Sequence, residues 1–216
     1  MTPVRAGIWI AVTGAFAALN FFLSSSVEER DQDVVYSYAV LGNAVLIYSL
    51  LLVFVLAITN DGNRLDVLAL RAPASWWRAI GISLAAVAVI LVGAAIALSL
   101  TNAGDEQNLT PEDWDPSRAG PYAASFLAIV FIGPVVEELL YRGAGIGLLL
   151  PYGTPVAVLV TALLFGAGHG LVLSFGAFLW FGIVTALVRL GTDSVYPPIL
   201  VHSAFNAIGM TVPLFV

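Results

Sequence analysis

The chain has 216 residues, of which 60% are hydrophobic and only 10% are charged. A soluble globular domain carries about 25% charged residues, so this composition excludes a soluble enzyme and a soluble nucleic-acid binder. Apolar stretches of about eighteen residues recur along the chain, and stretches of that length are typical of membrane-spanning helices. The sequence therefore predicts an all-α polytopic membrane protein, folded as a transmembrane helical bundle.

The charged residues limit the partners. The formal net charge is -6 and every basic residue is an arginine, so no basic stripe is present that could follow a phosphate backbone. Nucleic acid is therefore not expected as a partner. The absence of cysteine excludes disulfides, thiolate metal sites and a cysteine nucleophile. The lack of lysine and the acidic loops favour a microbial source, so we expect a prokaryotic plasma membrane.

Runs with few or no charges predict seven spans, each near the ~20 residues that cross the hydrocarbon core. The first run has no small-residue cleavage signal, so we interpret it as an uncleaved span and not as a signal peptide. The connecting segments are polar and too short for a soluble domain, so residues 1–216 are predicted to form a single integral membrane domain. The predicted spans are 6–23, 34–59, 79–100, 121–149, 155–168, 171–188 and 196–216.

The arginines predict the orientation, because cytoplasmic segments carry an excess of positive charge. If the N-terminus is inside, the inner segments hold five arginines and the outer segments hold two. We therefore expect the N-terminus inside and the C-terminus outside. The inner arginines are then Arg5, Arg64, Arg71, Arg78 and Arg189, and the outer ones are Arg30 and Arg118.

Charged residues inside the predicted spans are confined to Glu137, Glu138 and Arg142, all in the fourth span. An ionisable side chain at membrane depth costs about 2.5–3.5 kcal/mol on insertion scales and indicates a functional site. Both histidines also lie in or beside apolar runs: His169 ends the fifth span, and His202 lies in the seventh.

Helical spacing predicts which of these side chains meet. Glu138 and Arg142 are i,i+4 neighbours in the favourable order for an ion pair. Glu137 lies about 100° around the helix from Glu138, so we expect it to have a different partner. At 1.5 Å per residue, Glu137 and His169 reach similar depths, whereas His202 comes out shallower. A site containing His202 therefore requires a tilted or broken helix.

The chemistry of these groups suits peptide hydrolysis. A carboxylate and a neutral imidazole that share one water can remove its proton and make it a nucleophile. A second histidine, His202, and the amide of Asn206 one turn later could donate hydrogen bonds to the oxyanion that forms. For Arg142 we favour a structural and electrostatic role. Two other interpretations stay open, namely a buried Glu138–Arg142 pair that only locks packing and interhelical hydrogen bonds without catalysis.

Three motifs occur in order on the late spans. Glu137-Glu-Leu-Leu-Tyr-Arg142 fits E-E-x-x-x-R, Phe165-Gly-Ala-Gly-His169 fits F-x-x-x-H, and His202-Ser-Ala-Phe-Asn206 fits H-x-x-x-N. Together they resemble the CAAX protease and bacteriocin-processing (CPBP, or abortive-infection) family of intramembrane proteases. The resemblance covers residues 121–216, which carry the predicted catalytic motifs, and the first hundred residues match only as generic spans.

The resemblance implies an all-helical intramembrane endopeptidase related to the CAAX prenyl endopeptidase. Its substrate would be a peptide or lipidated protein at the bilayer, including a prenylated CAAX-like one. Carried over by position, Glu137 and His169 would activate the water and Glu138 would support that site. His202 with Asn206 would form the oxyanion hole, and Phe165 would line the pocket. Family members often have eight spans, which makes eight the alternative to seven.

We expect no metal, because the sequence lacks the H-E-x-x-H spacing that places two zinc ligands one helical turn apart. The alternative is a divalent ion such as zinc held by Glu137, His169 and His202. The alternative function is a non-proteolytic immunity or scaffold protein, or a proton-coupled transporter. A transporter would be expected to contain an inverted repeat, and we find none. The sequence does not predict the natural substrate or the oligomeric state.

Overall fold

The computed structural model describes residues 3–26, 34–60, 63–103, 106 and 114–212, and all regular secondary structure in these ranges is helical. The predicted all-α class is therefore confirmed. The long helices are α1 (Pro3–Ser25), α2 (Tyr38–Ile58), α4 (Trp76–Thr101), α8 (Thr154–Gly168), α9 (Phe175–Thr192) and α10 (Tyr196–Thr211). The short helices η1 (Val34–Tyr36) and α3 (Arg64–Val67) lie in the connections.

The fourth predicted span is longer than expected and changes its helical type along its length. It is continuously helical over Pro116–Tyr152, with two π-helical segments inserted into α-helix. One reason is Pro134, which has no N–H to donate to the preceding turn, so the helix widens just before it. The pieces are η2 (Pro116–Arg118), α5 (Ala119–Leu127), η3 (Ala128–Ile132), α6 (Gly133–Glu138), η4 (Leu139–Gly145), α7 (Ile146–Leu149) and η5 (Leu150–Tyr152).

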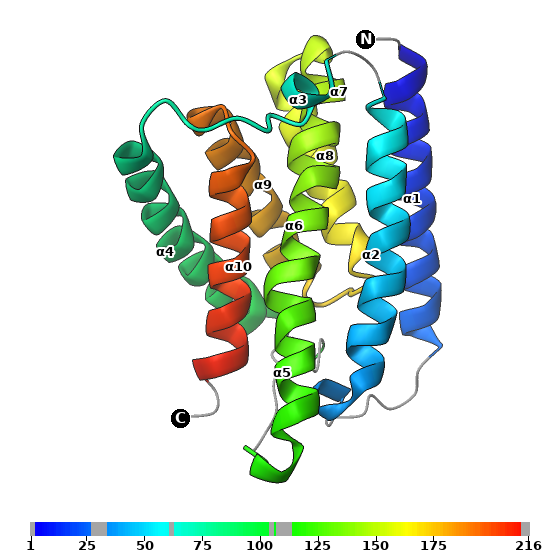
Figure 1. Cartoon of the computed structure of the whole chain (residues 1–216), viewed down its shortest axis with the longest axis vertical. Helices are drawn as coiled ribbons and strands as arrows, with labels where there is room; N and C mark the ends of the chain where they lie inside the picture. Colours follow the sequence, from blue (N-terminus) through cyan, green and yellow to red (C-terminus); the bar gives the residue numbers. More distant parts are fainter. Residues whose placement is uncertain (1–2, 27–33, 61–62, 104–105, 107–113, 213–216) are drawn as a thin grey trace.

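Five helical segments in the described ranges are long and apolar enough to cross a membrane. They are α1, α2, α4, Pro116–Tyr152 and α9. The helices at the fifth and seventh predicted spans, α8 and α10, have 15 and 16 residues, which is short of the ~20 needed for a full crossing. The predicted count of seven is therefore not confirmed. The N- and C-terminal ends of the chain lie at opposite ends of the bundle (Figure 1).

The helices pack around the segment that contains α6 (Figure 1). α2 and α10 both contact α6 and η3, α8 packs on α1 and α9, and α4 covers α9 and α10. α8 and α9 approach closely at Gly182, where an added Cβ would lie 2.9 Å from the Cα of Ala162. α1 is tied to η4 because the indole N–H of Trp9 donates to the carbonyl of Leu140 at 3.0 Å.

The connection between α9 and α10 is fixed at the end of the bundle where α3 lies. Val195 N–H donates to the carbonyl of Ala69 at 3.0 Å, and the Ser194 hydroxyl donates to the carbonyl of Arg71 at 2.6 Å. The Arg71 guanidinium also pairs with Asp193 at 2.7 Å. These bonds set where α10 begins, and so they determine the level at which His202 enters the bundle.

Candidate active site

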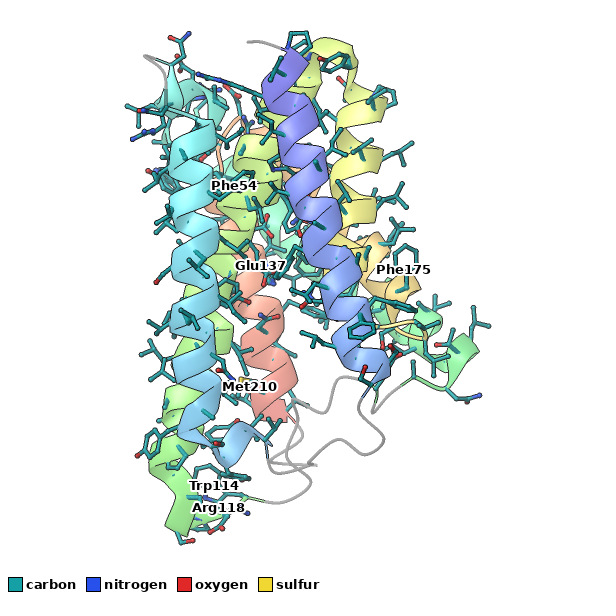
Figure 2. The ribbon with its side chains drawn as sticks, turned by 90° about the vertical axis from the view of Figure 1, so that its right-hand side faces the viewer. Phe54, Trp114, Arg118, Glu137, Phe175 and Met210 are labelled. Atoms are coloured by element: carbon teal, nitrogen blue, oxygen red, sulfur yellow. The ribbon has the colours of Figure 1, made fainter. Side chains whose placement is uncertain are left out.

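The two adjacent glutamates of α6 face different surroundings. Glu137 is half-buried, and one of its carboxylate oxygens, Oε1, accepts a hydrogen bond from the Tyr48 hydroxyl of α2 at 2.5 Å. Glu138 is fully buried, and its partners are Arg142 in η4, one turn later, and His202 of α10. The expectation that Glu137 has a different partner from Glu138 is confirmed. Figure 2 shows Glu137 in the interior, well away from both ends of the bundle.

Glu138 is the centre of a buried charged cluster. Its Oε1 lies 3.0 Å from Nη1 of Arg142 and 2.9 Å from Nδ1 of His202. The same guanidinium donates to the carbonyl of Gly182 at 3.1 Å and stacks 4.4 Å from the ring centroid of Phe165. The predicted i,i+4 pair is confirmed, and it connects the α6–η4 segment to α9 and α10.

His202 reaches Glu138, although its depth calculated for regular α-helices was shallower. The π-helical segment η4 lies between Glu138 and the end of the helix at Leu149. A π turn contains more residues than an α turn, so the chain advances less per residue and Glu138 lies nearer that end. The depth calculation required a tilted or broken helix, and this π segment reduces the difference in depth between Glu138 and His202.

His169 follows α8 directly and has its ring fixed by two contacts. Its Nδ1 lies 2.9 Å from the carbonyl oxygen of Phe165, which can only accept, so Nδ1 carries the proton. The ring stacks on Phe178 with centroids 3.8 Å apart. The other ring nitrogen, Nε2, consequently keeps its lone pair and can act as a base.

His202 and Asn206 lie one turn apart on α10. His202 is 5% exposed, and its ring contacts the edges of Phe181 and Phe165. The Asn206 amide donates to the carbonyl of Ile129 in η3 at 2.8 Å. One of its two amide N–H groups is used in this bond, which leaves the second for a ligand.

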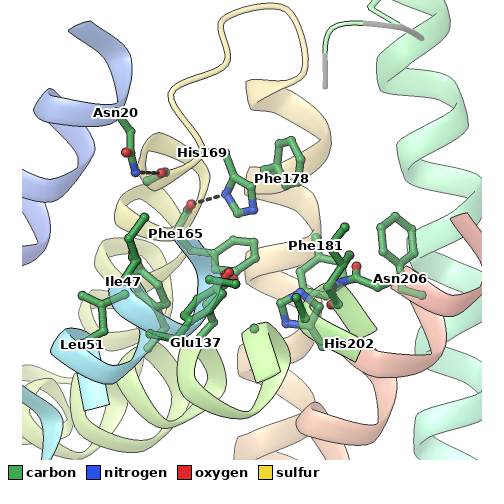
Figure 3. A pocket seen from close by; sticks show the side chains of 18 of the residues that line it. Asn20, Ile47, Leu51, Glu137, Phe165, His169, Phe178, Phe181, His202 and Asn206 are labelled. Carbon is green, nitrogen blue, oxygen red and sulfur yellow. Dashed lines mark hydrogen bonds between the residues drawn. The ribbon is translucent and has the colours of Figure 1, made fainter. Parts of the chain in front are cut away.

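One cavity of about 380 Å³ brings five of the predicted side chains together (Figure 3). A volume of this size is typical of sites that bind small molecules or peptide side chains. Glu137, His169, His202 and Asn206 line the cavity, and so does Phe165. Glu138 and Arg142 do not line it and lie behind His202. The sequence placed all seven residues in one site, and the structure divides them into lining residues and supporting residues.

A metal site can be assessed from the donor groups. Among the described residues, no three His, Cys, Asp or Glu side chains are grouped so that they could hold a metal ion. Nδ1 of His202 faces Glu138 and not Glu137. The alternative zinc set of Glu137, His169 and His202 does not form such a group in this arrangement of the described residues.

Residues 119–208 match the family model described as type II CAAX prenyl endopeptidase Rce1-like. We refer to this matched segment as the Rce1-like domain. It begins with α5, ends within α10 and contains all three motifs, so the resemblance stated from the sequence is confirmed. In the other two comparisons, no curated protein and no solved structure matches the chain.

Two polar side chains from outside the Rce1-like domain also line the cavity, and sequence reasoning missed both. Tyr48 of α2 bonds Glu137, and Asn20 of α1 donates its amide to the carbonyl of Gly168 at 2.6 Å. Gly170 has φ 66° and packs so closely on the Asn20 backbone that an added Cβ would lie 2.6 Å from its carbonyl carbon. α1 thus holds the turn that carries His169. The available signal was a polar side chain within an apolar run.

A third contact reaches the Rce1-like domain from the connection between α4 and α5. The carboxylate of Glu106 accepts the backbone N–H groups of Val172, Leu173 and Ser174 at 2.9, 3.0 and 2.6 Å. These three residues precede α9 and follow the His169 turn. Burial alone would raise the pKa of Glu106, but the hydrogen bonds from Leu173, Ser174 and Val172 outweigh it and lower that pKa.

Substituting Glu106 with Ala is expected to make the amides of residues 172–174 exchange with solvent about 10- to 100-fold faster, because each loses a hydrogen bond to a charged acceptor. Hydrogen–deuterium exchange measures this directly.

Because the pKa of Glu106 is lowered in the folded state, its contact stabilises the fold above the ordinary glutamate pKa. The contact is lost only as the pH falls through the lowered pKa. Asp115→Ala, in the same connection, is the control. Unchanged exchange in Glu106→Ala would show that the contact does not protect the turn.

Proposed function

We propose that the chain is an intramembrane endopeptidase of the glutamate type, which hydrolyses a peptide bond of a membrane-associated substrate with an activated water. The observation that supports this most strongly is the single cavity lined by Glu137, His169, His202 and Asn206 within an Rce1-like domain. The substrate class is a peptide or lipidated protein, including a prenylated CAAX-like one, because the family model describes a prenyl endopeptidase.

In the proposed reaction a water lies between the Glu137 carboxylate and Nε2 of His169. The carboxylate removes one proton as the water oxygen attacks the carbonyl carbon of the scissile bond. A tetrahedral oxyanion forms, and Glu137 then passes the proton to the departing amine nitrogen as the carbon–nitrogen bond breaks. The products are a carboxylic acid and an amine, with no covalent enzyme intermediate.

The oxyanion would be held by His202 and by the second amide N–H of Asn206. An ionised Glu138 can only accept, so Nδ1 of His202 must carry a proton toward it. Donation from Nε2 to the oxyanion then requires a proton on that nitrogen as well. In this mechanism Glu138 accepts from Nδ1 of His202 and so orients the ring, with Nε2 toward the oxyanion.

We further propose that no metal takes part and that the whole chain, residues 1–216, forms one membrane domain with seven spans, with eight as the alternative that the family resemblance implies. The N-terminus would be inside a prokaryotic plasma membrane. The support for this orientation is the clustering of arginines in the segments that include α3 and the start of α4.

The test is cleavage of prenylated and unprenylated peptides by the purified protein in detergent, with and without a chelator. Cleavage that is unaffected by the chelator and lost in His169→Ala supports the glutamate-type mechanism. Chelator-sensitive cleavage would instead support a divalent ion at Glu137, His169 and His202. If folded protein cleaves none of the peptides, the immunity, scaffold or transporter alternatives are favoured and the cluster is a packing element.

A further inference from the structure

Tyr48 contacts the candidate base from outside the Rce1-like domain. It lies in the middle of α2, lines the cavity and donates its hydroxyl to Oε1 of Glu137 at 2.5 Å. In the described part of the chain the other oxygen, Oε2, makes no hydrogen bond. The terminal torsion of a glutamate is soft, so a carboxylate needs a fixed partner to hold one orientation. Tyr48 fixes one oxygen and leaves the other to the cavity.

Gly133 provides the space for this hydroxyl. It lies one helical turn before Glu137, on the same face of α6. An added Cβ at Gly133 would lie 2.9 Å from the Tyr48 hydroxyl oxygen and 3.2 Å from the ring carbon that bears it. Its φ of -55° suits any residue, so the backbone does not require glycine here. Glycine is favoured at position 133 because a larger residue would contact the Tyr48 hydroxyl.

We propose that Tyr48 is a positioning residue for the Glu137 carboxylate. The absence of a side chain at Gly133 leaves the space that the Tyr48 hydroxyl occupies. Tyr48 acts through Glu137, aiming Oε2 at the water. This inference rests on the proposed peptidase function. It adds α2 to the catalytic apparatus, because a residue about 90 positions upstream sets the geometry of the base.

The two residues allow a double-mutant cycle. Tyr48→Phe removes only the hydroxyl, and Gly133→Ala should displace it by contact. We expect each substitution to lower kcat for peptide cleavage about 10- to 100-fold with little change in KM, since misplacing a catalytic group by about 1 Å has effects of this size. In the double variant the hydroxyl is already gone, so kcat should fall no further than in either single variant.

A matched control lies on the same two helical segments outside the cavity. Tyr38 begins α2, and an added Cβ at Gly120 of α5 would lie 2.8 Å from its hydroxyl. Tyr38 is 63% exposed and does not line the cavity. Tyr38→Phe and Gly120→Ala are therefore expected to leave kcat and KM unchanged, whereas a general packing effect between α2 and the α5–α6 segment would alter them.

A spectroscopic readout separates this inference from the proposed function. The infrared carboxylate stretch of Glu137 is identified as the band lost in Glu137→Gln, and Tyr48→Phe should shift it. An unshifted band, or unchanged kcat in Tyr48→Phe, overturns the positioning role even if the unmodified protein cleaves peptides. If the unmodified protein cleaves no peptide, the peptidase proposal fails, and the positioning role in catalysis fails with it. A shifted band would then establish only the hydrogen bond.

Discussion

Replacing Glu137 with Gln is expected to lower kcat for peptide hydrolysis by about 10²–10⁴-fold, the range typical of losing a general base. Glutamine has nearly the same shape, and its carbonyl oxygen can still accept the Tyr48 hydroxyl at the position of Oε1. It cannot remove a proton from water. Steady-state cleavage of the best peptide of the panel measures the effect, and circular dichroism during heating measures the stability, which we expect to stay near that of the unmodified protein.

The neighbouring position provides the comparison for this prediction. Glu138→Gln removes a carboxylate of the same size from the same helix, but from a site that does not line the cavity. We expect it to lower the melting temperature, because Arg142 and His202 both lose their charged partner. Full activity in Glu137→Gln would contradict the role of Glu137 as the base. Equal loss of stability in the two variants would contradict the role of Glu138 as the stabilising charge partner.

Replacing Arg142 with Leu is expected to lower the free energy of unfolding by about 3–5 kcal/mol, the range for breaking one partner of a buried ion pair. Arg142 and Glu138 are both fully buried, so the remaining carboxylate would be left without its guanidinium in a low-dielectric interior. The carbonyl of Gly182 and the ring of Phe165 would also lose their contacts with the guanidinium. Equilibrium unfolding in detergent micelles measures the change.

The double variant Glu138→Leu and Arg142→Leu tests the cause of this loss. If the cost comes from an uncompensated charge, removing both charges should recover much of the stability, because apolar residues can replace a buried pair at little net cost. If the cost comes from lost packing, the double variant should be at least as unstable as Arg142→Leu. Activity should stay low in the double variant, since His202 no longer has the carboxylate at its Nδ1.

The different surroundings of Glu137 and Glu138 follow from one feature of the helix. Successive residues differ by about 100° in direction, so adjacent glutamates on α6 cannot share an environment. One faces the cavity and the hydroxyl of α2, and the other faces a histidine of α10 and an arginine one turn away. A site that needs both a free base and a fixed counter-charge can therefore obtain them from two consecutive residues.

The sequence by itself determined the all-helical class, the Glu138–Arg142 pair and the different partner of Glu137. These follow from composition and from helical periodicity, both of which are local: 3.6 residues per turn fixes which side chains are neighbours on one helix. The polar residues in apolar runs also identified four of the polar side chains that line the cavity, namely Glu137, His169, His202 and Asn206, because such residues are rare in spans.

Only the tertiary structure decided which helices face one another. Tyr48 and Glu137 are 89 positions apart, and Asn20 and Gly168 are 148 positions apart, so no periodicity relates them. The contact between His202 and Glu138 joins residues 64 positions apart, and it forms only once α10 packs against α6. Contacts across a bundle depend on how whole helices pack, and residue spacing within one helix does not predict them.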